Sequence, residues 1–141
     1  MKIPQALAAV GALALLLTGC GTTEDPAEPA AAAGDSLTVT DSRGVEVELD
    51  GPAKRVVGTE WNVVENLVTL GVTPVGAADV EGYSAWVSGV PLDDSVTDIG
   101  TRGEPSLDTI ASLDADLIVA TTDLAENVIT QLEELAPVVV V

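Results

Sequence analysis

Arg102 is the residue whose type and position most clearly suggest ligand chemistry. It is the only cation in the second half of the chain, and it lies in the glycine-flanked sequence GTRG. Its guanidinium offers a planar set of donors that suits anionic oxygens. Tyr83 and Trp86 lie close together in an irregular stretch, and Trp61 opens a helical pattern. Because aromatic rings provide flat apolar walls, these four residues predict a small-ligand site on loops at one edge of a sheet.

A structural role for the same residues is the alternative interpretation. Arg102 could pair with Glu104 or Asp98, which lie near it in the sequence. The aromatic residues could then fill a small core below their loop. Composition by itself does not separate the two interpretations.

The composition excludes several other classes of site. The chain has no histidine and a single cysteine, so Cys/His zinc sites and histidine-based catalysis are excluded. Its 23 acidic and 5 basic residues give a formal charge of -18, and such a surface repels nucleic acid. We therefore expect a protein that is not an enzyme, with no metal ligands and no nucleic-acid partner.

The first residues have the pattern of a targeting segment. Lys2 precedes an apolar run from Ala6 to Leu17, which is shorter than the roughly 20 residues of a membrane-spanning helix. The following Leu17-Thr18-Gly19-Cys20 resembles the lipobox of bacterial lipoproteins. That resemblance implies a signal peptide over residues 1–19 and acylation of Cys20, which would anchor the protein to the membrane outside the cytoplasm. An ordinary secreted protein with an incidental cysteine is the alternative.

Residues 20–36 predict a flexible, acidic tether, because they are rich in Ala, Pro and Glu and lack bulky apolar residues. Residues 37–141 predict an α/β domain. The pattern begins with an antiparallel hairpin and continues as alternating strands and helices, with a sheet covered by helices on both faces. The expected elements are a hairpin over 37–49, strands at 55–58, 74–78, 98–100, 116–121 and 138–141, and helices at 60–70 and 105–113, with a last helix capped by Thr122 or Asp123.

The part from Val39 to Val141 resembles the N-terminal lobe of the iron-siderophore periplasmic binding proteins of ABC importers, and most closely their ferric hydroxamate branch. The matching sequences are RVV at 55–57, EW at 60–61, PVG at 74–76, YSAWVS at 83–88 and PLDDSVTDIGTRGEP at 91–105. The resemblance implies a two-lobed fold in which the ligand lies between the lobes. The connecting helix and the second lobe of that family are not in this sequence, so we expect a domain that is incomplete.

The resemblance also implies roles for individual residues. Trp86 would pack on the ligand and Arg102 would donate hydrogen bonds to hydroxamate oxygens, with Tyr83 and Trp61 as further residues of the cleft wall. Iron would arrive chelated by the siderophore, so no cofactor is expected. Asp108, or its neighbour Glu104, would dock onto arginines of the permease. Asp108 is shorter than the glutamate usual in the family, and no aromatic residue stands near Leu124, where the hydroxamate branch tends to have one.

The expected function is therefore that of an extracytoplasmic substrate-binding lipoprotein of an ABC importer. It would bind a ferric siderophore, with the hydroxamate type favoured, and deliver it to a membrane permease. The same fold with a corrinoid, haem or catecholate ligand is one alternative. The other is a truncated surface lipoprotein that acts as a partner-binding module or has no transport function.

Overall fold

The computed structural model describes residues 36–141. Strands β1 (Leu37–Thr40) and β2 (Glu46–Leu49) form the predicted antiparallel hairpin, in which Val39 is paired with Val47. The Asp41 carboxylate organises the turn between them by accepting the backbone N–H groups of Arg43 and Val45. The expected hairpin is confirmed.

The turn of the hairpin also contacts the edge of the main sheet. The N–H of Ser42 donates to the carbonyl of Val140 at 2.8 Å, and the N–H of Val140 donates to Asp41 at 3.4 Å. Arg43 then joins Asp41 to Glu133 through ion pairs of 2.7 and 2.8 Å. These contacts tie the first described element to the last one.

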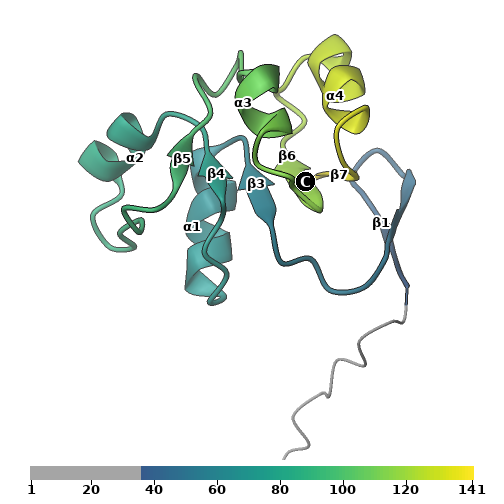
Figure 1. Cartoon of the computed structure of the whole chain (residues 1–141), viewed down its shortest axis with the longest axis horizontal. Helices are drawn as coiled ribbons and strands as arrows, with labels where there is room; N and C mark the ends of the chain where they lie inside the picture. Colours follow the sequence, from purple (N-terminus) through teal and green to yellow (C-terminus); the bar gives the residue numbers. More distant parts are fainter. Residues whose placement is uncertain (1–35) are drawn as a thin grey trace, which may run out of the picture. The chain divides into compact units, whose positions relative to one another are not determined.

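The main sheet has five parallel strands in the order β5-β4-β3-β6-β7 (Figure 1). The strands are β3 (Val56–Gly58), β4 (Gly76–Ala77), β5 (Thr97–Asp98), β6 (Leu117–Ala120) and β7 (Val138–Val140). The sequences of β3, β6 and β7 are rich in Val, Ile and Ala, as expected for strands that are covered by helices. The predicted α/β class is confirmed.

In chain order, each of the first four strands of this sheet, from β3 to β6, is followed by a helix. They are α1 (Trp61–Thr69), α2 (Val80–Trp86), α3 (Leu107–Ala111) and α4 (Glu126–Glu133). The chain moves outward from β3 in one direction through β4 and β5, and in the other through β6 and β7. Because such crossovers are right-handed, the two halves place their helices on opposite faces of the sheet.

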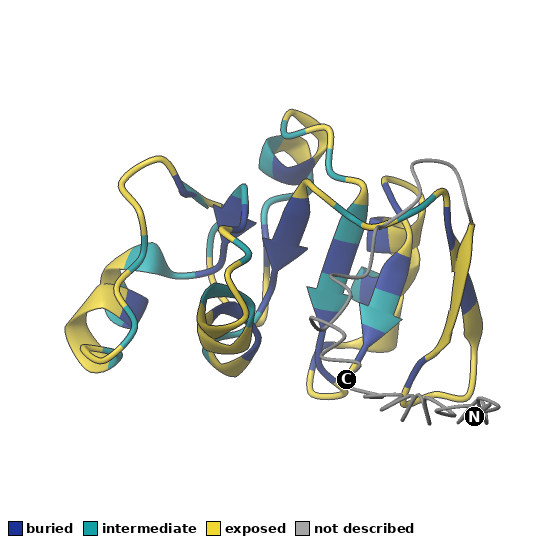
Figure 2. Ribbon diagram, turned by 90° about the horizontal axis from the view of Figure 1, so that it is seen from below, coloured by how far each residue is buried: buried dark blue, intermediate teal, exposed yellow. Residues whose placement is uncertain are grey.

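Two apolar clusters, one on each face, agree with this arrangement. The first joins sheet residues such as Val57 and Ile118 to Ile110 of α3 and Leu132 of α4. The second joins Ala77 to Val64 of α1 and Tyr83 of α2. Figure 2 shows the buried residues concentrated in the strands and on the inner sides of the helices. The expectation of helices on both faces is confirmed.

The structure corrects the sequence analysis in two places. The stretch around Tyr83 and Trp86 was expected to be irregular, but it contains α2, which Asp79 caps by accepting the N–H of Gly82. The last helix was expected to begin at a Thr122 or Asp123 cap, but its N-cap is Ala125, and among residues 36–141 no side chain caps it. The N–H of Leu124 instead donates to the carbonyl of Thr121, so a turn precedes the helix.

None of the helices within residues 36–141 has the length and apolar character that crossing a membrane requires.

Candidate functional site

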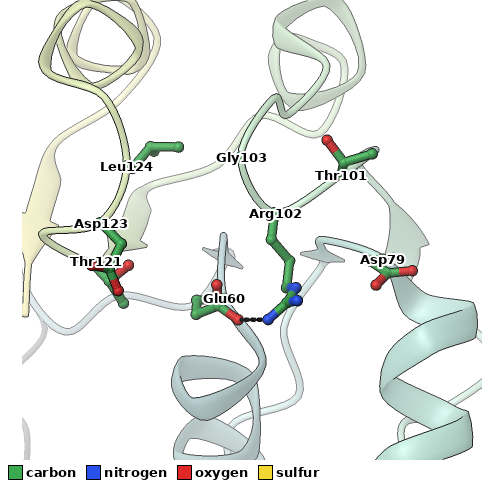
Figure 3. Close-up of a pocket in the computed structure, with 8 residues that line it drawn as sticks. All are labelled: Glu60, Asp79, Thr101, Arg102, Gly103, Thr121, Asp123 and Leu124. Carbon is green, nitrogen blue, oxygen red and sulfur yellow. Dashed lines mark hydrogen bonds and ion pairs between the residues drawn. The ribbon is translucent and has the colours of Figure 1, made fainter.

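A pocket of about 490 Å³ opens where the parallel strands end. The central strands β3 and β6 are neighbours, and the chain leaves them in opposite directions. In open α/β sheets, ligands bind in the crevice that this change of direction creates at the carboxyl ends of the strands. The lining residues come from the loops after β3, β4, β5 and β6, and they are Glu60, Asp79, Thr101, Arg102, Gly103, Thr121, Asp123 and Leu124 (Figure 3).

Arg102 crosses the pocket toward the start of α1. Its Nη1 donates to Oε1 of Glu60 at 2.8 Å, and its guanidinium carbon lies 4.1 Å from the ring centroid of Trp61. The hydrogen bond to Glu60, together with the negative charges of Glu60 and Asp79, raises the pKa of Arg102 above its ordinary value. The partner is therefore Glu60 and not Glu104 or Asp98, the two acids that lie near Arg102 in the sequence.

The Asp98 carboxylate binds backbone groups and not the guanidinium of Arg102. It accepts the backbone N–H groups of Val80 at 3.0 Å and Gly100 at 2.7 Å. These bonds join the start of α2 to the loop that carries Arg102. Asp98 therefore stabilises the position of that loop rather than the charge of the guanidinium.

Trp61 is held on the side of α2. Its Nε1 donates to the carbonyl oxygen of Asp79 at 3.3 Å. The ring also packs closely against Gly82, since a Cβ atom built there would lie 2.5 Å from Cζ2 of the indole. Asp79 itself has a left-handed backbone with φ of 51°. A non-glycine residue in this region is strained, and such strain is often found at functional sites.

Glu60 connects the pocket to the helix below it. It is the N-cap of α1, and its Oε1 accepts the backbone N–H of Trp61 at 2.9 Å as well as the Arg102 guanidinium. The side chain is thereby fixed in two directions. Glu60, Asp79 and Asp123 were not expected to line a site: Glu60 was noted only in the matched EW sequence, and Asp123 only as a possible helix cap. Their common signal is an acidic residue just after a predicted strand.

Of the four residues predicted for the site, only Arg102 lines this pocket, and Trp61 lies under its guanidinium without being a lining residue. Tyr83 and Trp86 are outside the lining residues as well. Both belong to α2 rather than to an irregular loop. Tyr83 is fully buried, and its hydroxyl donates to the carbonyl of Val90 at 2.8 Å. Burial raises the pKa of Tyr83, and the charge of Glu65 raises it further. Trp86 is 79% exposed, so its side chain is presented to solvent.

The predicted docking residues are both on the surface. Asp108 lies in the first turn of α3, and Glu104 precedes it in the loop after Arg102. The N–H of Glu104 donates to the hydroxyl of Thr101 at 3.2 Å, so its backbone is fixed while its side chain is exposed. Cys20, the predicted lipidation site, lies outside the described residues, as do the predicted signal peptide and most of the predicted tether.

The loop after β6 contributes two polar residues and one leucine to the pocket. Thr121 is buried at the end of β6, and Asp123 and Leu124 follow it in the turn before α4. The turn at 121–124 leaves Asp123 at the pocket instead of at the helix cap. Within residues 36–141, no group of three or more acidic or cysteine side chains gathers in a way that could hold a metal ion.

Comparison with known proteins gives several relatives of one kind. The chain is 33% identical over 126 residues to the Fe(3+)-citrate-binding protein YfmC of Bacillus subtilis, a match that covers 89% of this chain and 40% of the relative. It is 41% identical over 88 residues to YhfQ of the same species, described as a putative ABC transporter substrate-binding lipoprotein, with 61% of this chain and 27% of the relative covered. No protein-family model matches the chain.

Solved structures agree with these sequence matches. The siderophore-binding protein FhuD of Vibrio cholerae, determined with Fe3+-Desferal bound, is 40% identical with a TM-score of 0.59 over 62% of this chain and 32% of that protein. The chain is therefore similar in sequence and in fold to part of several siderophore- and ferric-citrate-binding proteins. It spans between about a quarter and two fifths of the length of the three relatives named here.

Proposed function

We propose that this chain is a ligand-binding lobe of an extracytoplasmic substrate-binding lipoprotein of an ABC importer. It binds a ferric siderophore and presents it to a membrane permease. The observation that carries the proposal is the guanidinium of Arg102, a residue that lines the pocket and stacks on Trp61. A guanidinium in this position offers charge-assisted donors that suit the oxygens of a chelated metal.

The relatives support this choice of ligand and the absence of catalysis. Their names describe binding proteins for ferric citrate and for a siderophore, and none describes an enzyme. The Desferal bound to the Vibrio protein is a hydroxamate, which favours that class here. Iron reaches the pocket already chelated by the siderophore. The protein therefore supplies hydrogen-bond donors and apolar contacts for the complex and needs no metal ligand of its own.

A membrane anchor at Cys20 belongs to the same proposal, and it is supported by the lipoprotein among the relatives. Two or more acyl chains are required for stable anchoring. Expression in a bacterial host with the lipoprotein-processing enzymes should place the chain in the membrane fraction. Cys20→Ala should shift it to the soluble fraction. Retention of the variant in the membrane would contradict lipidation at this residue.

Docking to the permease is assigned to Asp108 and Glu104, whose exposed carboxylates can meet cationic side chains. Asp108→Asn and Glu104→Gln should lower siderophore uptake in the source cell without changing the affinity of the isolated chain for its ligand. A fall in ligand affinity would instead place these residues in the binding site.

The direct test of the function is a titration of the chain with ferric desferrioxamine, followed by tryptophan fluorescence. The chain has only two tryptophans, so Trp86→Phe leaves Trp61 as the reporter and Trp61→Phe leaves Trp86. The pocket geometry predicts strong quenching of Trp61. The family resemblance predicts quenching of Trp86. The two variants therefore test both expectations separately.

Arg102→Ala should weaken binding by about tenfold or more, since hydrogen bonds to charged groups contribute roughly 1.5–3 kcal/mol. Lys54→Ala is the matched control, because it removes one exposed cation that does not line the pocket. Equal binding by the wild type and by Arg102→Ala would contradict the proposed site. Absence of binding by the wild type would contradict the proposed function of this lobe.

A further inference from the structure

The pocket carries an excess of negative charge. Among its lining residues, Arg102 is the single cation, and it is also the residue expected to hold the ligand. Three carboxylates, those of Glu60, Asp79 and Asp123, line the pocket together with the single guanidinium of Arg102. The formal sum of one positive and three negative charges is -2. The chain as a whole carries -18, so the surrounding surface does not offset this excess.

Glu60 already compensates the charge of Arg102. The two side chains form an ion pair of 2.8 Å, and the Glu60 side chain is 23% exposed. The carboxylate cannot turn away from this position without releasing the N–H of Trp61, which it caps at 2.9 Å. Loss of an N-cap is unfavourable for the helix, so the pairing is built into the start of α1.

A paired arginine recognises a ligand differently from an unpaired one. A guanidinium has five N–H donors. Within the described residues, Arg102 uses one of them in a side-chain hydrogen bond, which it donates to Glu60. The remaining donors can still bind ligand oxygens directionally. The net positive charge that would attract an anionic ligand is, however, largely cancelled by the carboxylate beside it.

We infer that Glu60 is a specificity-determining residue, which makes the pocket favour ferric complexes without net negative charge over anionic ones. This inference rests on the proposed siderophore-binding function. In a trihydroxamate complex the singly charged hydroxamates balance the charge of Fe3+. Ferric catecholates and ferric citrate keep an excess of negative charge, which the carboxylates of Glu60, Asp79 and Asp123 repel.

Glu60→Gln tests the inference with little structural change. The glutamine keeps an acceptor oxygen for the N–H of Trp61 and for Arg102, but it removes the negative charge. The chain and its variant are titrated with ferric desferrioxamine, a trihydroxamate, and with ferric citrate. The ratio of the two dissociation constants should move by about fivefold to tenfold in favour of ferric citrate, as expected when one charge is removed beside the ligand.

Glu65→Gln is the matched control. Glu65 is an exposed residue of the same helix that does not line the pocket, and its substitution changes the total charge equally. It should leave the ratio unchanged. In the wild type, raising the salt concentration should reduce the preference for the trihydroxamate, because exposed charges are screened.

The outcomes separate this inference from the proposed function. A ratio that stays constant in Glu60→Gln while both complexes still bind overturns the role of Glu60. An equal shift in Glu65→Gln assigns the effect to total charge and overturns it as well. Absence of binding for both complexes in the wild type overturns the proposed function, and this inference with it. Thermal melting of the variants checks that each of them is folded.

Discussion

The guanidinium of Arg102 stacks on the indole of Trp61, with 4.1 Å between the guanidinium carbon and the ring centroid. Arg102 lies in the loop after β5, and Trp61 is the first residue of α1, which follows β3. The two residues meet because those strands end at the same edge of the sheet. Glu60 and Asp79 fix the pair from either side, one through the arginine and the other through the indole N–H. The candidate site is thus one connected unit with four members.

Replacement of Trp61 should weaken this unit. Trp61→Leu removes the surface under Arg102 and the hydrogen bond to Asp79. A cation–π contact at an exposed site contributes about 0.5–1 kcal/mol, so we expect a loss of about 1 kcal/mol in the free energy of unfolding. Chemical denaturation measures it. Trp86→Leu is the control, because its side chain is 79% exposed and its loss should change stability by less than about 0.5 kcal/mol.

Gly82 should be intolerant of a side chain. In Gly82→Ala the new Cβ would lie 2.5 Å from Cζ2 of Trp61. Overpacking costs about 1–3 kcal/mol, whereas alanine gains only about 1 kcal/mol in a helix, so the overall effect should be destabilising. Displacement of the indole should also weaken ligand binding. Gly89→Ala, at a position with no neighbour within 4 Å of the added atom, should have little effect on either measurement.

Tyr83 is expected to contribute to stability rather than to ligand contact. Tyr83→Phe removes the hydroxyl that donates to the carbonyl of Val90 and leaves that carbonyl without this donor. The expected cost is about 1 kcal/mol in the free energy of unfolding. The dissociation constant for ferric desferrioxamine should stay within about twofold of the wild-type value, because Tyr83 lies outside the pocket and makes no polar contact with the ligand. A large loss of affinity without a loss of stability would place Tyr83 in the cleft wall after all.

Acid should weaken the attachment of the hairpin through Asp41. Burial alone would raise the pKa of this carboxyl, but hydrogen bonds from Arg43, Val45 and Val140 outweigh it and lower the pKa below the ordinary value of 3.8. A carboxyl whose pKa is lowered in the folded state stabilises the fold at pH values above its ordinary pKa of 3.8. This contribution is lost as the pH falls through the lowered pKa of the folded state.

Thermal melting as a function of pH tests this assignment. Asp41→Asn should lower the melting temperature at neutral pH and should reduce the further loss that acid causes. Asp50→Asn, at an exposed position just after the hairpin, is the control and should leave the acid-dependent loss as it is in the wild type. An acid response of Asp41→Asn identical to that of the wild type would contradict the assignment.

Much of the architecture could be predicted from local patterns. The alternation of Val45, Val47 and Leu49 indicated the hairpin, and the spacing of Val63, Val64 and Leu67 indicated α1. α2 was missed because it is only seven residues long, and its cap at Asp79 lies in a backbone conformation that propensity does not favour. The cap of α4 was misplaced because Asp123 has the residue type of a cap but lies in a turn before the helix.

The class of fold, the scarcity of cations around Arg102 and the resemblance to siderophore-binding proteins are all visible in the sequence. These features depend on residue types and on spacings along the chain, which can be read without coordinates. The three-dimensional arrangement is needed to see that Arg102 pairs with Glu60 and that Trp61 lies under it. It is also needed to see that Asp79 and Asp123 line the same pocket. The physical reason is the order of the strands. Parallel pairing with β3 and β6 at the centre brings loops that are distant in sequence to one edge, and no local pattern specifies which side chains meet there.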